Sequence, residues 1–160
     1  MIGGDLGAMM ARHARTGRID GIYLRPERRA AMLTPGSVDV FADGLHGDHA
    51  SAGKRAVTLL QAEHLPVISH LLGTDLIDPA KLRRNLLVSG INLLALRKTK
   101  IEIGDSILFI HGPCPPCSRM EEVLGTGGYS AVRGHGGVYA EVIKTGTISR
   151  GARVRRSDAD

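Results

Sequence analysis

The segment Lys100–Ile110, KIEIGDSILFI, is the part of the chain that decides its fold class. Two short runs rich in Ile and Leu, Lys100–Ile103 and Ser106–Ile110, flank the dipeptide Gly104-Asp105. Such runs around a Gly-Asp pair are typical of two antiparallel strands joined by a tight turn. We therefore expect a hairpin or near-hairpin here.

Similar short apolar runs recur along the chain. We expect further strands at residues 18–24, 30–34, 38–41, 56–60, 86–88, 138–143, 147–148 and 152–154. Only two modest helices are expected: residues 61–72, which end at Gly73, and residues 118–125, which begin with the capping pattern S-x-x-E. Many short strands and few helices favour a mainly β, barrel-like or sandwich domain. A doubly wound α/β fold needs helices between successive strands, and most of the chain lacks them.

The length of 160 residues suits one domain with a full core. We expect a flexible N-terminal segment at 1–17, the domain at 18–156 and a tail at 157–160. No run approaches the ~20 apolar residues of a membrane span, and the first residues lack the apolar stretch of a secretory signal. These features favour a soluble, cytoplasmic protein without membrane contact.

The formal net charge of +5 favours anionic partners such as phosphorylated cofactors. Aromatic residues are scarce, with no Trp, two Phe and three Tyr, so a platform for stacking nucleic-acid bases is hard to build. The composition therefore directs attention to small anionic ligands and away from nucleic acid.

Both cysteines lie in one stretch, GPCPPCSRM at residues 112–120. Cys117 precedes the expected helix, where free backbone N–H groups and the guanidinium of Arg119 favour its thiolate form. Four interpretations compete: a dithiol redox pair, a zinc site, two small loop hydrophobes, or one reactive thiolate facing an anionic ligand. A zinc site would add two histidines from the set His46, His49, His111 and His135.

An ordered set of motifs favours the reactive thiolate. The motifs are GLHGDHA at 44–50, RAVTLL at 55–60, RRNL at 83–86, GPCPPCSRM at 112–120 and GHGGVYA at 134–140. In this order they resemble the MOSC domain family, which is related to the C-terminal part of molybdenum cofactor sulfurases. The resemblance runs from about Ile19 to Val154.

The resemblance implies a β-rich, barrel-like fold with a few short helices and one functional cysteine. Cys117 stands at the end of the pattern P-x-x-P-C and would carry sulfur or ligate molybdenum. An enzyme that transfers sulfur, or that uses the molybdenum cofactor on a small substrate, is thus implied. The family is also associated with pyridoxal phosphate enzymes. Cys114 departs from the family pattern, and a second thiol there could resolve a persulfide as a disulfide.

Two alternatives from other classes remain. One is a non-catalytic module that binds or delivers the molybdenum cofactor or another phosphorylated ligand. The other is a zinc-stabilised β domain that docks to a partner protein. For the enzyme and for the binding module, the expected partners are a small substrate or cofactor and a sulfur-donor or cofactor-delivery protein.

Three residues are expected to act in the chemistry. Cys117 is the nucleophile, carrier or molybdenum ligand, Arg119 stabilises its thiolate, and His49 is the candidate acid or base. The alternative for His49 is an exposed position in a turn built by Asp48.

Five residues are expected to bind the cofactor: Arg83, Arg84, Asn85, Arg55 and Asp48. Arg84 is preferred over Arg83, since adjacent residues of an extended chain point to opposite sides. Asn85 would contact the pterin or backbone. Arg55 would either pair with Asp48 or face the anion.

Overall fold

The computed structural model describes residues 3–50 and 52–158. The strands are β1 (Gly17–Ile22), β2 (Ser37–Phe41), β3 (Gly44–Leu45), β4 (Val57–Gln61), β5 (Leu86–Ser89), β6 (Lys100–Ile103), β7 (Ser106–Pro113), β8 (Val138–Lys144), β9 (Gly146–Ser149) and β10 (Arg153–Arg156). The helices are α1 (Gly3–Met10), α2 (His64–Leu72), α3 (Arg119–Leu124) and α4 (Gly128–Val132), with 3-10 turns η1 (Pro79–Leu82) and η2 (Leu93–Leu96).

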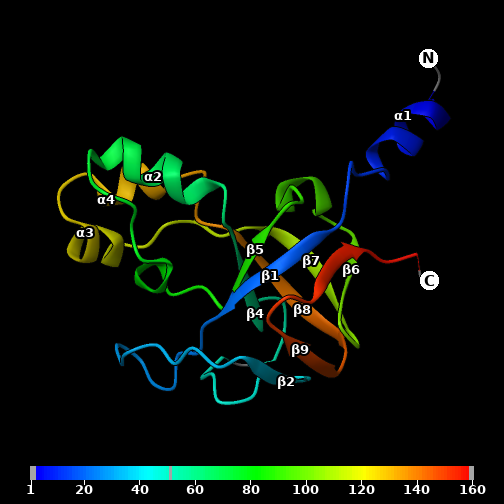
Figure 1. Ribbon diagram of the computed structural model, residues 1–160, viewed down its shortest axis with the longest axis horizontal. Coiled ribbons are helices and arrows are strands. Elements are labelled where there is room, and N and C mark those ends of the chain that lie inside the picture. The colour runs from blue at the N-terminus through cyan, green and yellow to red at the C-terminus, as the bar shows by residue number, and fades with distance from the viewer. Residues whose placement is uncertain (1–2, 51, 159–160) are drawn as a thin grey trace.

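Seven strands close a barrel in the order β1-β10-β6-β7-β8-β4-β5 (Figure 1). The predicted hairpin is its β6–β7 pair, in which Ile103 lies opposite Ser106. Gly104 has a φ of 57°, the left-handed conformation that a type II′ turn needs at its first central residue. The mainly β, barrel-like fold class is therefore confirmed.

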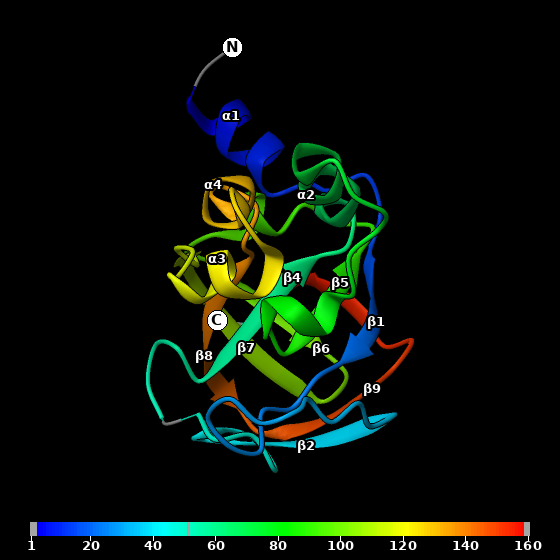
Figure 2. The same cartoon turned by 90° about the vertical axis from the view of Figure 1, so that its left-hand side faces the viewer.

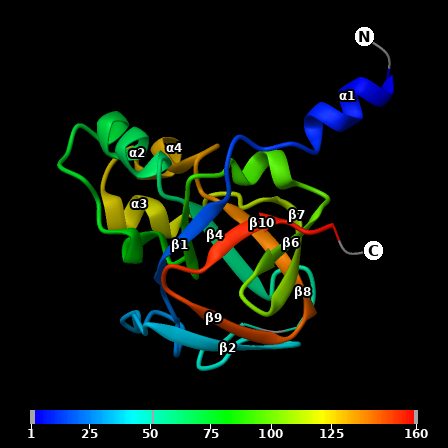
Figure 3. The same ribbon diagram turned by 45° about the vertical axis from the view of Figure 1, so that its right-hand side comes forward.

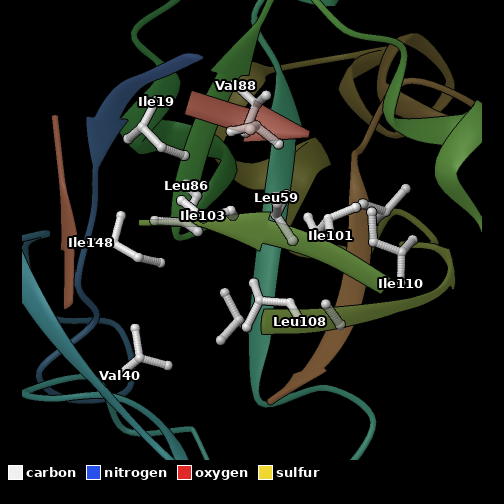
Figure 4. Close-up of a cluster of buried hydrophobic side chains, with 14 of the residues drawn as sticks. Ile19, Val40, Leu59, Leu86, Val88, Ile101, Ile103, Leu108, Ile110 and Ile148 are labelled. Carbon is white, nitrogen blue, oxygen red and sulfur yellow. The ribbon is translucent and has the colours of Figure 1, made fainter. Parts of the chain in front are cut away.

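Residues at every second position of β7 are buried, as expected of a strand with one face toward a core. Ile19, Leu59, Val88 and Leu108 fill the inside of the barrel (Figure 4). The small sheet β3-β2-β9 lies on the opposite side of the barrel from α2 and α4 (Figure 2).

The strand β4 buries all five of its residues, because it is covered on both faces. A second apolar cluster packs α2, α3 and α4 on the outside of the barrel at β4 and β5. It consists of Leu60, Leu65, Ile68, Ile77, Leu82, Leu87, Met120, Ala131 and Val132. This helical layer holds the cysteine segment in place against the barrel.

The prediction of a strand at residues 30–34 is wrong. This part of the chain is a loop with one isolated β-bridge, between Leu33 and Leu24, which lies just after β1. Arg29 has a φ of 64°, and Leu33 is 52% exposed. A left-handed residue and an unburied apolar side chain do not suit a strand.

The helix expected at 118–125 is present as α3, but its predicted capping box is not formed. The hydroxyl of Ser118 makes no capping hydrogen bond. Glu121 instead accepts hydrogen bonds from the backbone N–H groups of Gly127 and Tyr129, at the start of α4. These bonds lower the pKa of Glu121. Glu121 therefore stabilises the helix after its own.

The N-terminal helix α1 extends away from the barrel (Figures 1 and 3). The side chains of residues 5–10 are all exposed. The expected flexibility of residues 1–17 stays a prediction. Within the described part of the chain, every helix is too short or too polar to cross a bilayer.

Candidate functional site

A cavity of about 320 Å³ opens beside the cysteine segment. This volume falls at the lower end of the range for small-molecule sites. Four segments distant in the sequence form its walls: the loops after β1 and β3, the end of η1 and the start of α3. The lining residues are Arg25, Arg28, Arg29, His49, Leu82, Arg83, Arg84, Cys117, Ser118, Arg119 and Met120.

The two cysteines have different environments. Cys117 is exposed and lines the cavity, whereas Cys114 is only 5% exposed. Burial raises the pKa of Cys114 and outweighs the nearby arginines, which lower it. A hydrogen bond of 2.8 Å from the Cys114 N–H to the Gly137 carbonyl holds this part of the loop. Cys117 is therefore the accessible thiol and Cys114 the protected one.

Arg119 presents an unused hydrogen-bond donor. Its Nε is buried and has no hydrogen-bond partner among the described residues. Burial, Arg119 and Arg25 together lower the pKa of Arg83, so these guanidiniums repel one another. A buried donor without a partner in a positively charged site favours an anionic ligand.

Arg84 ties the cysteine segment to the loop before β8. Its Nε donates to the Gly136 carbonyl at 2.7 Å, and its Nη2 donates to the Pro115 carbonyl at 3.4 Å. A Cβ on Gly136 would lie 3.4 Å from Nη2 of Arg84 and 3.2 Å from the Cys114 carbonyl. Arg84 thus has a structural task in addition to its place at the cavity.

Arg83 holds the loop after β1. Its Nη1 and Nη2 donate to the carbonyls of Ala30 at 2.6 Å and Glu27 at 3.3 Å. Arg83 has a φ of 56° at the end of η1, so it is left-handed and not extended. This conformation explains why both Arg83 and Arg84 line the cavity, although an extended chain would have turned them apart.

Asp48 forms a buried ion pair with Arg25. The Nε and Nη2 of Arg25 donate to its two carboxylate oxygens at 3.1 and 2.9 Å, and the Asp48 side chain is 0% exposed. Burial raises the pKa of Asp48, but the hydrogen bonds from Arg25 outweigh burial and hold this pKa below its usual value. The next residue, His49, lines the cavity and is exposed.

Asn85 and Arg55 do not line the cavity. The oxygen of the Asn85 amide accepts hydrogen bonds from the N–H and hydroxyl of Thr58, and its nitrogen donates to the Tyr23 carbonyl. Asn85 thus connects β4 to the end of β1. Arg55 stacks on the ring of Tyr139, 4.3 Å from its centroid, and does not pair with Asp48.

The histidines proposed as zinc ligands point to different partners. His46 contacts the ring of Phe41, His111 bonds to Glu141 and His135 packs on His64. Among the described residues, no three His, Cys, Asp or Glu side chains are placed to hold a metal ion together. The zinc interpretation thus has no ligand set in this part of the chain.

Sequence reasoning missed three of the arginines that line the cavity, Arg25, Arg28 and Arg29. They belong to the segment RPERR at 25–29, a cluster of like charge between the first strand and a loop. Such a cluster is usually a solvated surface, and only its contact with Arg83 shows that it closes the site.

The chain is a closed β-barrel protein that presents an exposed thiol in a cavity lined by arginines. A model of the MOSC domain family matches residues 46–155. The chain belongs to the MOSC domain family, and the resemblance drawn from its motifs is confirmed. Arg25, Arg28 and Arg29 precede the matched region.

Solved structures share the fold at low sequence identity. YuaD protein from Bacillus subtilis has a TM-score of 0.78 at 19% identity, covering 88% of this chain and 94% of its own. YiiM from Geobacillus stearothermophilus has a TM-score of 0.74 at 16% identity, covering 89% and 75%. YiiM from Escherichia coli has a TM-score of 0.69 at 17% identity, covering 89% and 71%. No curated protein matches this chain.

Proposed function

We propose that Cys117 carries sulfur as a persulfide and passes it to a small anionic acceptor bound in the arginine-lined cavity. The observation that supports this proposal most directly is the pairing of one exposed thiol with a buried, unpartnered donor on Arg119. The thiol is accessible to a sulfur donor, and Arg119 lines the cavity in which an anion would bind.

The proposed transfer has two steps, and neither needs an oxidant or reductant. In the first, the Cys117 thiolate attacks the outer sulfur of a donor persulfide, R–S–SH. A new S–S bond forms, the S–S bond of the donor breaks, and the donor leaves as RS⁻. In the second, a nucleophile of the acceptor attacks the outer sulfur of Cys117 and the Cys117 thiolate leaves. A sulfur-donor protein is thus the expected partner.

Two other residues have proposed roles in these steps. Arg119, two positions after Cys117, would stabilise the thiolate as attacking and leaving group. His49 lines the same cavity and is exposed, so it could take a proton from the acceptor nucleophile. Arg83 and Arg84 would hold the anionic part of the acceptor while keeping their contacts to the loops.

The molybdenum cofactor fits this site in part. The arginines suit its phosphate, and the exposed Cys117 suits molybdenum, since thiolates are soft ligands. When bound, the cofactor would supply a metal centre for chemistry on a small substrate. Asn85, the residue expected to contact the pterin, is fully buried and its amide is occupied by Thr58 and Tyr23. Asn85 is therefore not available to contact a pterin in the cavity.

Binding or delivery of a phosphorylated ligand without catalysis is the second candidate. The orphaned Nε of Arg119 favours it as much as it favours transfer, because both functions need an anion in the cavity. In that case a cofactor-delivery protein is the expected partner. For either function, a cytoplasmic location stays a prediction.

Mass spectrometry of the intact protein tests the proposal. After treatment with an alkyl persulfide and removal of the excess, we expect a mass gain of one sulfur atom, on Cys117 in a peptide map. The Cys117→Ser variant should show no gain, and the Cys114→Ser variant should behave like the wild type. An acceptor thiol should then remove the sulfur from the wild type.

Two results would overturn the proposal. One is a mass gain that persists in Cys117→Ser. The other is a persulfide on Cys117 that no thiol acceptor can discharge. Co-purification of a pterin with Cys117→Ser, without any sulfur on the wild type, would favour the binding and delivery function instead.

A further inference from the structure

We propose that the cavity recognises a diphosphate group, with Arg28 and Arg29 forming a second anion subsite beside the one at Arg119. This inference rests on the proposed function, since it takes the same cavity as the ligand site, and it names the chemical class of the ligand. It assigns a role to the loop after β1, which lies before the region matched by the family.

The charges around the cavity exceed what one phosphate can balance. Six arginines line it, and no carboxylate is among its described lining residues. Asp48 pairs with Arg25, and Glu122 contacts Arg29, so four guanidiniums lack a carboxylate partner. A phosphate monoester carries about −1.5 to −2 charges at neutral pH. One phosphate therefore leaves about two of these four charges unbalanced, and a second phosphate joined to it balances more of them.

The loop that carries Arg28 and Arg29 is held in place on both sides. Arg83 bonds to the carbonyls of Glu27 and Ala30, which flank the two arginines. The ion pair of Arg25 with Asp48 fixes the start of the loop. A loop that is already ordered loses less conformational entropy when it binds a ligand.

Arg29 is in a strained backbone conformation, with a φ of 64°. A left-handed residue other than glycine costs on the order of 1 kcal/mol and persists only where surrounding contacts enforce it. Here the enforcing contacts come from Arg83 and turn the basic segment toward the cavity.

Both arginines of the loop are available to a ligand. No side chain or carbonyl in the described part of the chain bonds to Arg28. The one ion pair of Arg29, with Glu122, is long at 3.9 Å, and its side chains are 64% and 61% exposed. An exposed pair at this distance contributes little, so an anion can displace Glu122.

Calorimetric titration of the full chain tests the inference. The probes are inorganic orthophosphate and pyrophosphate, at one ionic strength, and the protein is Cys117→Ser so that no thiol chemistry contributes. Pyrophosphate should bind at least about tenfold more tightly than orthophosphate, the value of one added charge-assisted hydrogen-bond contact. A diphosphate group can belong to a nucleotide or to a simpler molecule, and a parallel titration with ADP distinguishes the two. Tighter binding of ADP indicates a nucleotide ligand, and equal or weaker binding indicates a simpler diphosphate.

Two variants distinguish binding at the second subsite from a general effect of positive charge on the protein. Arg28→Gln should remove most of the advantage of pyrophosphate and leave orthophosphate binding within about twofold of its original value. Arg153→Gln, which removes an exposed arginine of β10 outside the cavity, is the matched control and should keep the advantage. Arg119→Gln should weaken both probes.

The inference is overturned if the two phosphates bind equally, or if Arg28→Gln and Arg153→Gln have the same effect. Because the titration uses a protein without the Cys117 thiol, its failure leaves sulfur transfer untouched. Conversely, a chain that carries no persulfide can still show the preference for pyrophosphate.

Discussion

Asp48 is a buried carboxylate whose charge a single arginine balances. Its pKa is lowered in the folded protein, so ionised Asp48 stabilises the fold above its ordinary pKa. This contribution disappears as the pH falls through the lowered folded-state value. The site therefore depends on an ion pair that strong acid disrupts.

Replacing Asp48 tests this dependence. Asp48→Asn should lower the free energy of unfolding by about 3 kcal/mol at neutral pH, because Arg25 loses its partner. The gap between the wild type and the variant should narrow as the pH falls below the ordinary pKa of an aspartate. It should close only below the lowered folded-state pKa, where Asp48 is protonated in both folded and unfolded chains. Urea unfolding at stepped pH measures both effects. Asp43→Asn, at an exposed carboxylate in the turn between β2 and β3, is the control. A constant gap across the pH range would contradict the assignment.

Single residues also show how far the sequence predicts the site. The sequence singles out Cys117 by its position before a helix and by its neighbour Arg119, because both features act within a few residues. Asn85 could not be judged in the same way. Its burial follows from the pairing of β4 with β5, which brings Thr58 to it from 27 residues away.

At the scale of elements, the glycine-rich connection between α4 and β8 packs against the protein itself. The Gly137 carbonyl accepts from Cys114, and a Cβ on Gly137 would overlap the Leu59 carbonyl. Gly134 has nearly the same φ, 87° against 90°, but a Cβ there meets open space. A side chain at Gly134 would therefore meet only backbone strain, whereas a side chain at Gly137 would also collide with β4.

Alanine at each position should give different results. Gly134→Ala should lower the free energy of unfolding by about 1–2 kcal/mol, the cost of a left-handed conformation for a residue other than glycine. Gly137→Ala adds the collision with β4 and should cost about 3 kcal/mol or more beyond that, since well-packed backbone cannot move away cheaply. Thermal unfolding measures both variants. Equal melting temperatures for the two variants would contradict the collision between a side chain at Gly137 and β4.

Element boundaries were predictable where the signal was local. The hairpin at Gly104 and the end of α2 at Gly73 follow from the turn and cap chemistry of a few residues. The start of α4 was not predicted, since its capping acceptor, Glu121, belongs to the preceding helix. The S-x-x-E pattern correctly indicated the start of a helix. The Glu121 carboxylate, however, accepts hydrogen bonds from the start of α4 and not from the start of its own helix.

At the scale of the whole molecule, barrel closure joins segments that no short pattern connects. The strands β1 and β10 pair across almost the full chain, with Gly17 opposite Val154. The sequence predicted a β-rich domain from its many strands, and the family resemblance implied the barrel. The strand order and the arginine loop over the cavity depend on long-range contacts such as that of Arg83 with Ala30, so strand counting does not reveal them.

The helix α1 should contribute little to the stability of the barrel. Leu6 and Met10 are 52% and 68% exposed, and the helix extends away from the strands (Figure 3). A chain that begins at Met10 should therefore melt within about 2 °C of the full chain, since the side chains of residues 5–10 are all exposed. Differential scanning calorimetry makes the comparison. A large drop would mean that α1 is covered by another surface in solution.

The walls of the cavity come from four stretches that meet only in the native state. A compound that occupies it therefore binds the folded chain and not the unfolded one, and it raises the melting temperature by mass action; at a hundred times its dissociation constant the gain is about 2.7 kcal/mol. A thermal-shift screen of phosphorylated metabolites can thus identify the natural ligand without an assay for any reaction.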